Sequence, residues 1–74
     1  MSTLARTIYL DSGFGVEQPL PKAGCALENR FVYDDVAREF RAMADRGLVE
    51  IVAQRTVSEA SDELIDELRF RRLR

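Results

Sequence analysis

Residues 33–57 constrain the fold more than any other segment, because a helical pattern ends there and a strand pattern begins at once. In "YDDVAREFRAMADRG", residues 33–47, apolar side chains recur three and four positions apart, which places one apolar stripe along a helix of about three turns. The stripe consists of Tyr33, Val36, Ala37, Phe40, Met43 and Ala44. Gly47 follows the last turn, where glycine adopts a left-handed conformation without strain. The pattern therefore predicts a helix over residues 34–46.

Two aspartates stand at the expected start of this helix. Asp34 and Asp35 are predicted to cap it and to complement its dipole, and Asp34 can pair with Arg38 one turn later. Residues 48–57, "LVEIVAQRTV", follow directly and alternate between apolar and polar side chains, which predicts a strand. The side of this strand that faces the core is expected to carry Val49, Ile51, Ala53 and Val57.

Residues 56–74 have a charge order that is typical of a helix, with Thr56 or Ser58 as its cap and Glu59 in a Thr-x-x-Glu capping box. Acids occupy the first half and arginines the last turns, which is the order that the helix dipole favours. On a helix the apolar stripe would contain Ala60, Leu64, Ile65 and Leu68. Phe70 and Leu73 fall on the opposite side of such a helix. We therefore expect a second helix, which either ends near Arg69 or carries a second apolar face.

The N-terminal half has weaker patterns. Residues 3–10, "TLARTIYL", contain β-branched and aromatic side chains in partial alternation, which predicts an edge strand. Residues 11–24, "DSGFGVEQPLPKAG", hold three of the four glycines and both prolines, so they predict a long loop that cannot form a helix. "RFVY", residues 30–33, indicates either a short strand or the first turn of the following helix.

These segments together predict a single small α+β domain over residues 1–74. Two or three strands would form a sheet that two helices cover on one face, in the order strand, loop, optional short strand, helix, strand, helix. The strand at 48–57 could pair with 30–33 in parallel or with 3–10 in antiparallel fashion. A chain of this size buries only about 60% of the surface that its unfolded form exposes. We therefore expect a homodimer, formed by pairing of open strand edges or by burial of Phe70 and Leu73 across a two-fold axis.

Composition excludes several kinds of chemistry. The 74 residues contain no histidine and one cysteine, Cys25, so catalysis by a serine–histidine or cysteine–histidine pair is excluded, as is an internal disulfide. Cys25 is interpreted as a buried or incidental thiol. There are 13 acidic and 11 basic residues, a net charge of −2, which creates no global attraction to nucleic acid or to an anionic membrane. No signal peptide and no membrane-spanning run is evident. We expect a cytoplasmic, non-enzymatic protein without cofactor or metal.

The glycine and carboxylate motifs are better explained by structural roles than by chemistry. Gly13 and Gly15 after a strand suggest a phosphate-binding loop, but Pro19 and Pro21 prevent the helix whose N-terminus would hold the phosphate. A structural turn is the better interpretation. Acidic pairs such as Asp34 with Asp35 stand where capping and solvation place acids in any case. The acids of 62–67 have the same explanation, and none of these groups predicts a catalytic site.

Two segments are candidates for binding a protein partner. Loops as long as 11–24 often contact partners, and Phe14 at its tip would be the anchor. The Arg-rich end, residues 69–74, "RFRRLR", interleaves arginines with apolar side chains, a pattern that can bind nucleic acid or an acidic protein surface. The simpler role for this end is to complement a helix dipole. The candidate partner-binding residues are Phe14, Arg69, Phe70, Arg71, Arg72 and Leu73.

Residues 32–52, "VYDDVAREFRAMADRGLVEIV", resemble the junction in winged-helix DNA-binding domains where the recognition helix runs into the wing. The resemblance implies a DNA-binding transcriptional regulator in which a helix enters the major groove. Phosphate or base contacts would then come from Arg38, Arg41, Arg46 and Arg55. Our preferred hypothesis from the sequence is a small protein-interaction or regulatory module, and DNA binding is the alternative. One continuous face of arginines would favour DNA, whereas arginines paired with acids would favour the interaction module.

Overall fold

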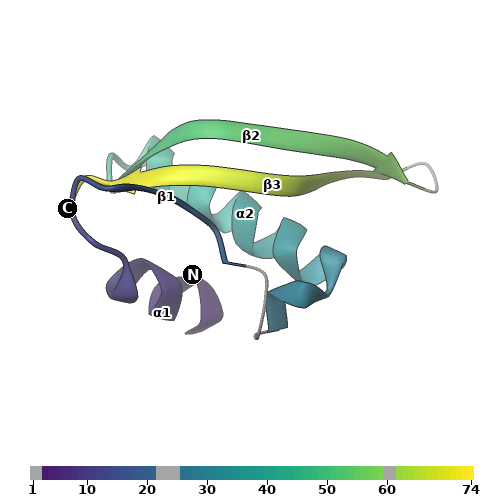
Figure 1. The fold of residues 1–74 in the computed structure, drawn as a ribbon, viewed down its shortest axis with the longest axis horizontal. Coiled ribbons are helices and arrows are strands. Elements are labelled where there is room, and N and C mark those ends of the chain that lie inside the picture. Colours follow the sequence, from purple (N-terminus) through teal and green to yellow (C-terminus); the bar gives the residue numbers. More distant parts are fainter. Residues whose placement is uncertain (1–2, 22–25, 60–61) are drawn as a thin grey trace.

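The computed structural model describes residues 3–21, 26–59 and 62–74. Two helices, α1 (Thr3–Asp11) and α2 (Arg30–Asp45), lie on one face of a three-stranded antiparallel sheet (Figure 1). The strands are β1 (Glu17–Pro19), β2 (Val49–Glu59) and β3 (Asp62–Arg72), in the order β1-β3-β2, and a short 3-10 turn, η1 (Ala26–Glu28), precedes α2. The predicted α+β class, a small sheet covered on one face by two helices, is confirmed. Within the described ranges, no helix is long and apolar enough to span a membrane.

Helix α2 matches the strongest sequence prediction, but it begins four residues earlier. Asn29 is the N-cap, and its side-chain oxygen accepts hydrogen bonds from the backbone N–H groups of Phe31 at 2.9 Å and Val32 at 3.3 Å. Residues 30–33 are therefore the first helical turn and not a strand. The prediction that Asp34 and Asp35 cap the helix is wrong, because both lie beyond its first turn.

The C-terminal end of α2 is closed as the sequence predicts. Gly47 has φ 77°, the left-handed conformation, and its N–H donates to the Ala44 carbonyl at 3.0 Å. The N–H of Leu48 donates to the Met43 carbonyl, also at 3.0 Å. This pair of bonds is the Schellman arrangement, which satisfies carbonyls that a helix end otherwise leaves unpaired. The chain then turns directly into β2.

The predicted N-terminal strand is wrong: residues 3–11 form the helix α1. Leu4, Ile8 and Leu10 alternate as in a strand, but Leu4 and Ile8 are also four residues apart, the spacing of one helix face. Ala5 is fully buried and Leu4 and Ile8 pack against the core. A run this short carries both periodicities, and its packing beside α2 decides between them.

The predicted C-terminal helix is also wrong, since residues 62–72 form β3, the central strand. Leu68 and Phe70 are buried, while Arg69 between them and Arg71 after Phe70 are only partly buried, which is the period of two expected for a strand. A helix would have put Phe70 on the side opposite to Leu68. Ala60, which the helical stripe included, lies outside the described residues.

The pairing of β2 also differs from both sequence alternatives. Its partner is β3, antiparallel, and neither 3–10 nor 30–33. Of the four side chains predicted to face the core, Val49 is buried and Ile51 partly buried, while Ala53 and Val57 are exposed. The strand has two register shifts, between Ile51 and Ala53 and between Arg55 and Thr56, and residues 52–58 are exposed on both of its faces. Such shifts interrupt the regular alternation of faces along a strand.

The described part of the 11–24 loop is a strap along the sheet. Glu17–Pro19 pair with Arg69–Arg71, and Pro19 ends this short edge strand, where a missing backbone donor is tolerated. Leu20 is 2% exposed and extends the core beneath the strap. Lys22–Cys25, including the predicted incidental thiol, lie outside the described residues.

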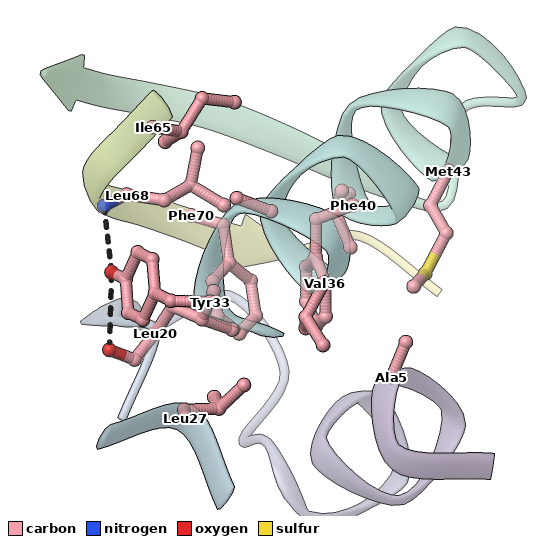
Figure 2. Packing of buried hydrophobic residues seen from close by; sticks show 12 residues of the cluster. Ala5, Leu20, Leu27, Tyr33, Val36, Phe40, Met43, Ile65, Leu68 and Phe70 are labelled. Carbon is pink, nitrogen blue, oxygen red and sulfur yellow. Dashed lines mark hydrogen bonds between the residues drawn. The ribbon is translucent and has the colours of Figure 1, made fainter. Parts of the chain in front are cut away.

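The core lies between α2 and β3 (Figure 2). The rings of Phe40 and Phe70 meet at 4.6 Å between centroids, tilted by 56°, a favourable geometry for an aromatic pair. Tyr33 and Leu27 are each 1% exposed and close the core near the start of α2, and Ala5 closes it from α1.

Candidate functional site: an aromatic and arginine cluster beside the open end of the sheet

Among the described residues, several exposed apolar side chains belong to the segments at the C-terminal ends of α1 and β3. Leu10, Phe14, Val16 and Leu73 are 55%, 64%, 56% and 50% exposed, and we call them the Phe14 patch. The connection after α1 runs beside the C-terminal end of the chain in Figure 1. Phe14 forms a parallel bridge with Arg72, and the N–H of Gly15 donates to the Arg72 carbonyl at 2.9 Å. Segments from both ends of the chain therefore build one surface.

Arg72 holds this surface together. Its guanidinium carbon lies 4.1 Å from the ring centroid of Phe14 and 4.5 Å from that of Tyr9, so two aromatic rings contact the cation. Its Nη1 donates to the carbonyls of Leu10 at 3.3 Å and Ser12 at 3.1 Å, at the C-terminal end of α1. A cation there complements the negative end of the helix dipole. The sequence placed Arg72 on a helix end, and the structure places it on a strand that caps another helix.

Further hydrogen bonds fix the connection that carries Phe14. The Ser12 hydroxyl donates to the Tyr9 carbonyl at 2.6 Å, and Ser12 is 8% exposed. The Tyr9 hydroxyl donates to the Arg74 carbonyl, and Nε of Arg72 donates to the same carbonyl at 2.6 Å. The residues on either side of Phe14 are thereby tied to the sheet and to α1, while the Phe14 ring itself remains exposed.

The other candidate partner-binding residues fall on different sides of the molecule. Phe70 is 1% exposed, so its predicted contact with a partner, or burial across a two-fold axis, is wrong: the core of this chain already buries it. Arg69 pairs with Glu17 at 3.0 Å and Arg71 with Glu50 at 2.7 Å, both across neighbouring strands. Leu73 is half exposed and belongs to the Phe14 patch.

The four candidate DNA-binding arginines do not form one free cationic face. Arg38 pairs with Asp34 at 3.0 Å, and Arg55 pairs with Asp66 and, at 3.7 Å, with Glu67. Hydrogen bonding and charge from the paired aspartate raise the pKa of each of these two arginines. Arg41 and Arg46 are exposed on or just after α2 and form no ion pair within the part of the chain that the structure describes.

A second polar cluster, which sequence reasoning missed, lies where α2 meets β3. The Tyr33 hydroxyl accepts from the Leu68 N–H at 2.9 Å and donates to the Leu20 carbonyl at 3.4 Å (Figure 2). An Asp34 oxygen, Oδ1, accepts from the Ile65 N–H at 2.8 Å. β1 pairs with only residues 69–71 of β3. Beyond that short pairing, these side chains accept the hydrogen bonds that a longer neighbouring strand would otherwise accept from the β3 backbone.

Arg38 completes this polar edge. Its Nη2 donates to the Glu63 carbonyl at 2.9 Å while its Nε contacts the Asp34 carboxylate. Asp34 is only 7% exposed, and burial is the largest cause that raises the pKa of the Tyr33 hydroxyl. The sequence did contain a signal for this cluster. Asp34 is adjacent to Tyr33 of the apolar stripe, and Arg38 follows it one helical turn later. The place of Asp34 near the expected start of the helix predicts a cap instead, which is why the sequence pattern alone misses this role.

A small pocket and a more open groove lie along α2. A pocket of about 140 Å³ is lined by Tyr33, Leu27, Val57, Leu64 and Ile65, with Glu28, Arg30 and Asp66 also present. Ligand pockets for small molecules usually measure about 300 to 1,000 Å³, so this pocket has room for little more than one side chain. A more open groove of about 520 Å³ runs between the helices, lined by Leu4, Val32, Asp35, Val36 and Glu39.

Comparison with known proteins identifies no relative of this chain. No protein-family model, no curated protein and no solved structure matches the chain.

Proposed function

We propose that the chain is a small, non-enzymatic protein-interaction or regulatory module, which acts in the cytoplasm and binds its partner at the Phe14 patch. The observation that carries the proposal is the exposed aromatic on a fixed connection: Phe14 is 64% exposed although hydrogen bonds hold the backbone around it. Large apolar patches on small proteins often mark binding surfaces. A rigid aromatic anchor loses little conformational entropy when a partner covers it.

The charge distribution supports the same proposal. Arg55, Arg69 and Arg71 lie on the strands, and each is paired with an acid. A protein that neutralises DNA phosphates needs cations that are free to contact them. Arginines that are already paired with carboxylates on their own sheet are better suited to solubility and to strand pairing.

Photo-cross-linking in cells tests the proposal directly. A photoreactive phenylalanine analogue at position 14 is expected to form discrete cross-links to a protein. Phe31 is the matched control, because it is also a phenylalanine and is 50% exposed, but on α2. Cross-links that are absent at position 14, or equal at both positions, would contradict the proposal.

DNA binding is the second candidate, and the order of elements favours it. Two helical elements, α1 and η1, precede α2, and a hairpin of two long strands follows it. This order is consistent with the resemblance to winged-helix domains, in which α2 would be the recognition helix and β2 with β3 the wing. Arg41 and Arg46 would then be the arginines available for phosphates.

Salt dependence separates the two candidates. If the chain binds duplex DNA, the logarithm of its affinity falls with that of the salt concentration by about 0.9 per phosphate contact. Fluorescence anisotropy of a labelled duplex measures this slope, and Arg41→Ala together with Arg46→Ala should reduce it. A duplex that does not bind even at low salt eliminates the DNA candidate.

Self-association forms part of the proposed function. The outer edge of β2 runs from residue 49 to residue 59 and no described strand pairs with it, whereas α2 side chains cover the corresponding edge of β3. Unpaired strand edges favour pairing with another copy. We propose a homodimer through β2, which light scattering at micromolar concentration would detect as a doubled mass. A monomeric mass under these conditions would contradict it.

A further inference from the structure

The guanidinium of Arg72 is only partly used by its own chain. A guanidinium carries five N–H donors. Nε donates to the Arg74 carbonyl, and Nη1 donates to the carbonyls of Leu10 and Ser12. Among the residues that the structure describes, none accepts a hydrogen bond from Nη2. The two N–H donors of Nη2 therefore have no acceptor within the described part of the chain, and the guanidinium that carries them contacts the exposed ring of Phe14.

This free edge is held in a defined position. The rings of Tyr9 and Phe14 contact the guanidinium, and three hydrogen bonds fix its other two nitrogens. A flexible surface arginine loses rotamer freedom when it binds an anion, and that loss weakens binding. Arg72 has already lost this freedom through contacts within its own chain. The arrangement is preorganised for an acceptor next to an apolar group.

The local charge has the opposite sign to the net charge of the chain. The segments that carry the patch, residues 3–16 and 72–74, contain three arginines and one acid, Asp11, although the whole chain has a net charge of −2. Arg6 lies one helical turn before Leu10, and Arg74 follows Leu73. The strand acids Glu17 and Glu50 are paired with Arg69 and Arg71. The surroundings of the patch are thus locally cationic.

We propose that the Phe14 patch binds an acidic, amphipathic segment of a partner protein, with a carboxylate on Nη2 of Arg72 and a large apolar side chain against Phe14. This inference rests on the proposed function and names the chemistry of its partner. The carboxylate supplies the missing acceptors for Nη2 in a charge-assisted bond. The apolar side chain covers the exposed ring of Phe14. A nucleic acid duplex fits less well, because its bases are stacked inside the helix and its surface offers phosphates but no apolar group for Phe14.

A peptide selection tests the partner chemistry. A library of random twelve-residue peptides displayed on phage is selected on the folded wild-type chain after subtraction on Phe14→Ala. We expect the selected peptides to carry Asp or Glu within two positions of Leu, Phe or Trp. The tightest peptide is then synthesised in two forms, one with its acids and one with the matching amides. The amide form should bind about tenfold more weakly, since charge-assisted hydrogen bonds are roughly twice as strong as neutral ones.

Variants of two neighbouring arginines locate the carboxylate. Arg72→Lys keeps the positive charge but removes the planar guanidinium, whose N–H donors have fixed directions. Affinity for the acidic peptide should therefore fall about tenfold. Arg71→Lys is the matched control, because Arg71 pairs with Glu50 away from the patch, and should bind like the wild type. NMR of the wild-type chain supplies a measurement without any variant: the Arg72 guanidinium resonances should shift when the peptide is added, and those of Arg71 should not.

The outcomes separate this inference from the proposed function. Peptides that require Phe14 but bind equally well as amides, or equally well to Arg72→Lys, would overturn the carboxylate contact and leave the interaction module intact. Failure to select any peptide that depends on Phe14 would overturn both. A short single-stranded or duplex DNA that displaces the acidic peptide at lower concentration than the peptide itself would overturn the inference in favour of a phosphate ligand.

Discussion

The two polar clusters of this molecule perform the same task in opposite environments. At the edge of β3, Tyr33 and Asp34 satisfy backbone N–H groups from inside the core. At the other cluster, Arg72 satisfies backbone carbonyls at the surface, between two aromatic rings. A buried N–H without a partner is costly, whereas an exposed carbonyl can bind water. Substitutions in the Tyr33 and Asp34 cluster should therefore lower stability most, whereas the Arg72 cluster can contribute to binding at little cost in stability.

The largest expected difference is between the two phenylalanines of these regions. Phe70→Ala should lower the free energy of unfolding by about 3 to 5 kcal/mol, because it removes a buried ring that packs on Phe40. Phe14→Ala should change it by less than about 0.5 kcal/mol, because the ring is exposed. Urea unfolding measures both. Equal losses in the two variants would show that the Phe14 connection is part of the core.

Asp34→Ala is expected to have the next largest effect. It leaves the Ile65 N–H buried without its acceptor, which should cost about 2 kcal/mol of unfolding free energy. Asp35→Ala is the control, since Asp35 is exposed and should lie within about 0.5 kcal/mol of the wild type. If the two variants have the same unfolding midpoint in urea, the edge of β3 does not depend on the Asp34 carboxylate.

Tyr33 should make stability depend on pH in the alkaline range. Burial raises its pKa above the ordinary value, so the folded state holds the phenol proton more tightly than the unfolded chain does. The stabilisation is complete below about pH 10 and declines as the pH rises above it, by up to about 1.4 kcal/mol per pH unit.

Urea unfolding at a series of pH values between 8 and 11 measures this decline. Tyr33→Phe should lower stability at pH 8 by about 1 to 3 kcal/mol, because the Leu68 N–H loses its acceptor, and should flatten the alkaline decline. Tyr9→Phe leaves Tyr33 in place and should retain the decline. A decline that persists unchanged in Tyr33→Phe would assign it to another group.

Arg72→Met should lower stability less than Phe70→Ala, Asp34→Ala or Tyr33→Phe and so tests the surface side of the comparison. The loss of its ring contacts and hydrogen bonds should cost about 1 kcal/mol, since cation–π contacts at exposed sites contribute about 0.5 to 1 kcal/mol. Arg71→Met should cost less than about 0.5 kcal/mol, as expected for an exposed ion pair. If Arg72→Met lowered the free energy of unfolding by more than about 3 kcal/mol, the Arg72 cluster would be as important to stability as the buried core.

The contrast between the regions also explains which parts of the fold were predictable. The apolar stripe from Tyr33 to Met43 and the stop at Gly47 are local signals, and both appear in the structure. Residues 62–72 have the charge order of a helix, yet they form the central strand because β1 and β2 pair with both of their edges. Those pairings join residues far apart in the sequence, and no local pattern records them.

The candidate site was predictable only in part. Phe14 was singled out as the tip of a long loop, and it is the most exposed large apolar side chain among the described residues. Its neighbours Tyr9 and Arg72 lie 63 positions apart in the sequence, yet they contact each other in the structure. The spacing of residues within one segment cannot indicate such a contact, since it depends on how the two ends of the chain meet.

The sequence by itself determined the central helix with its glycine stop, the strand that follows, the α+β class and the absence of histidine chemistry. Each follows from the local periodicity or the composition of the side chains. The tertiary structure alone decided that residues 3–11 are a helix and residues 62–72 a strand, because both segments carry two periodicities at once. It also placed Asp34 in the core and Arg72 between two rings, since both positions depend on which distant segments the chain buries together.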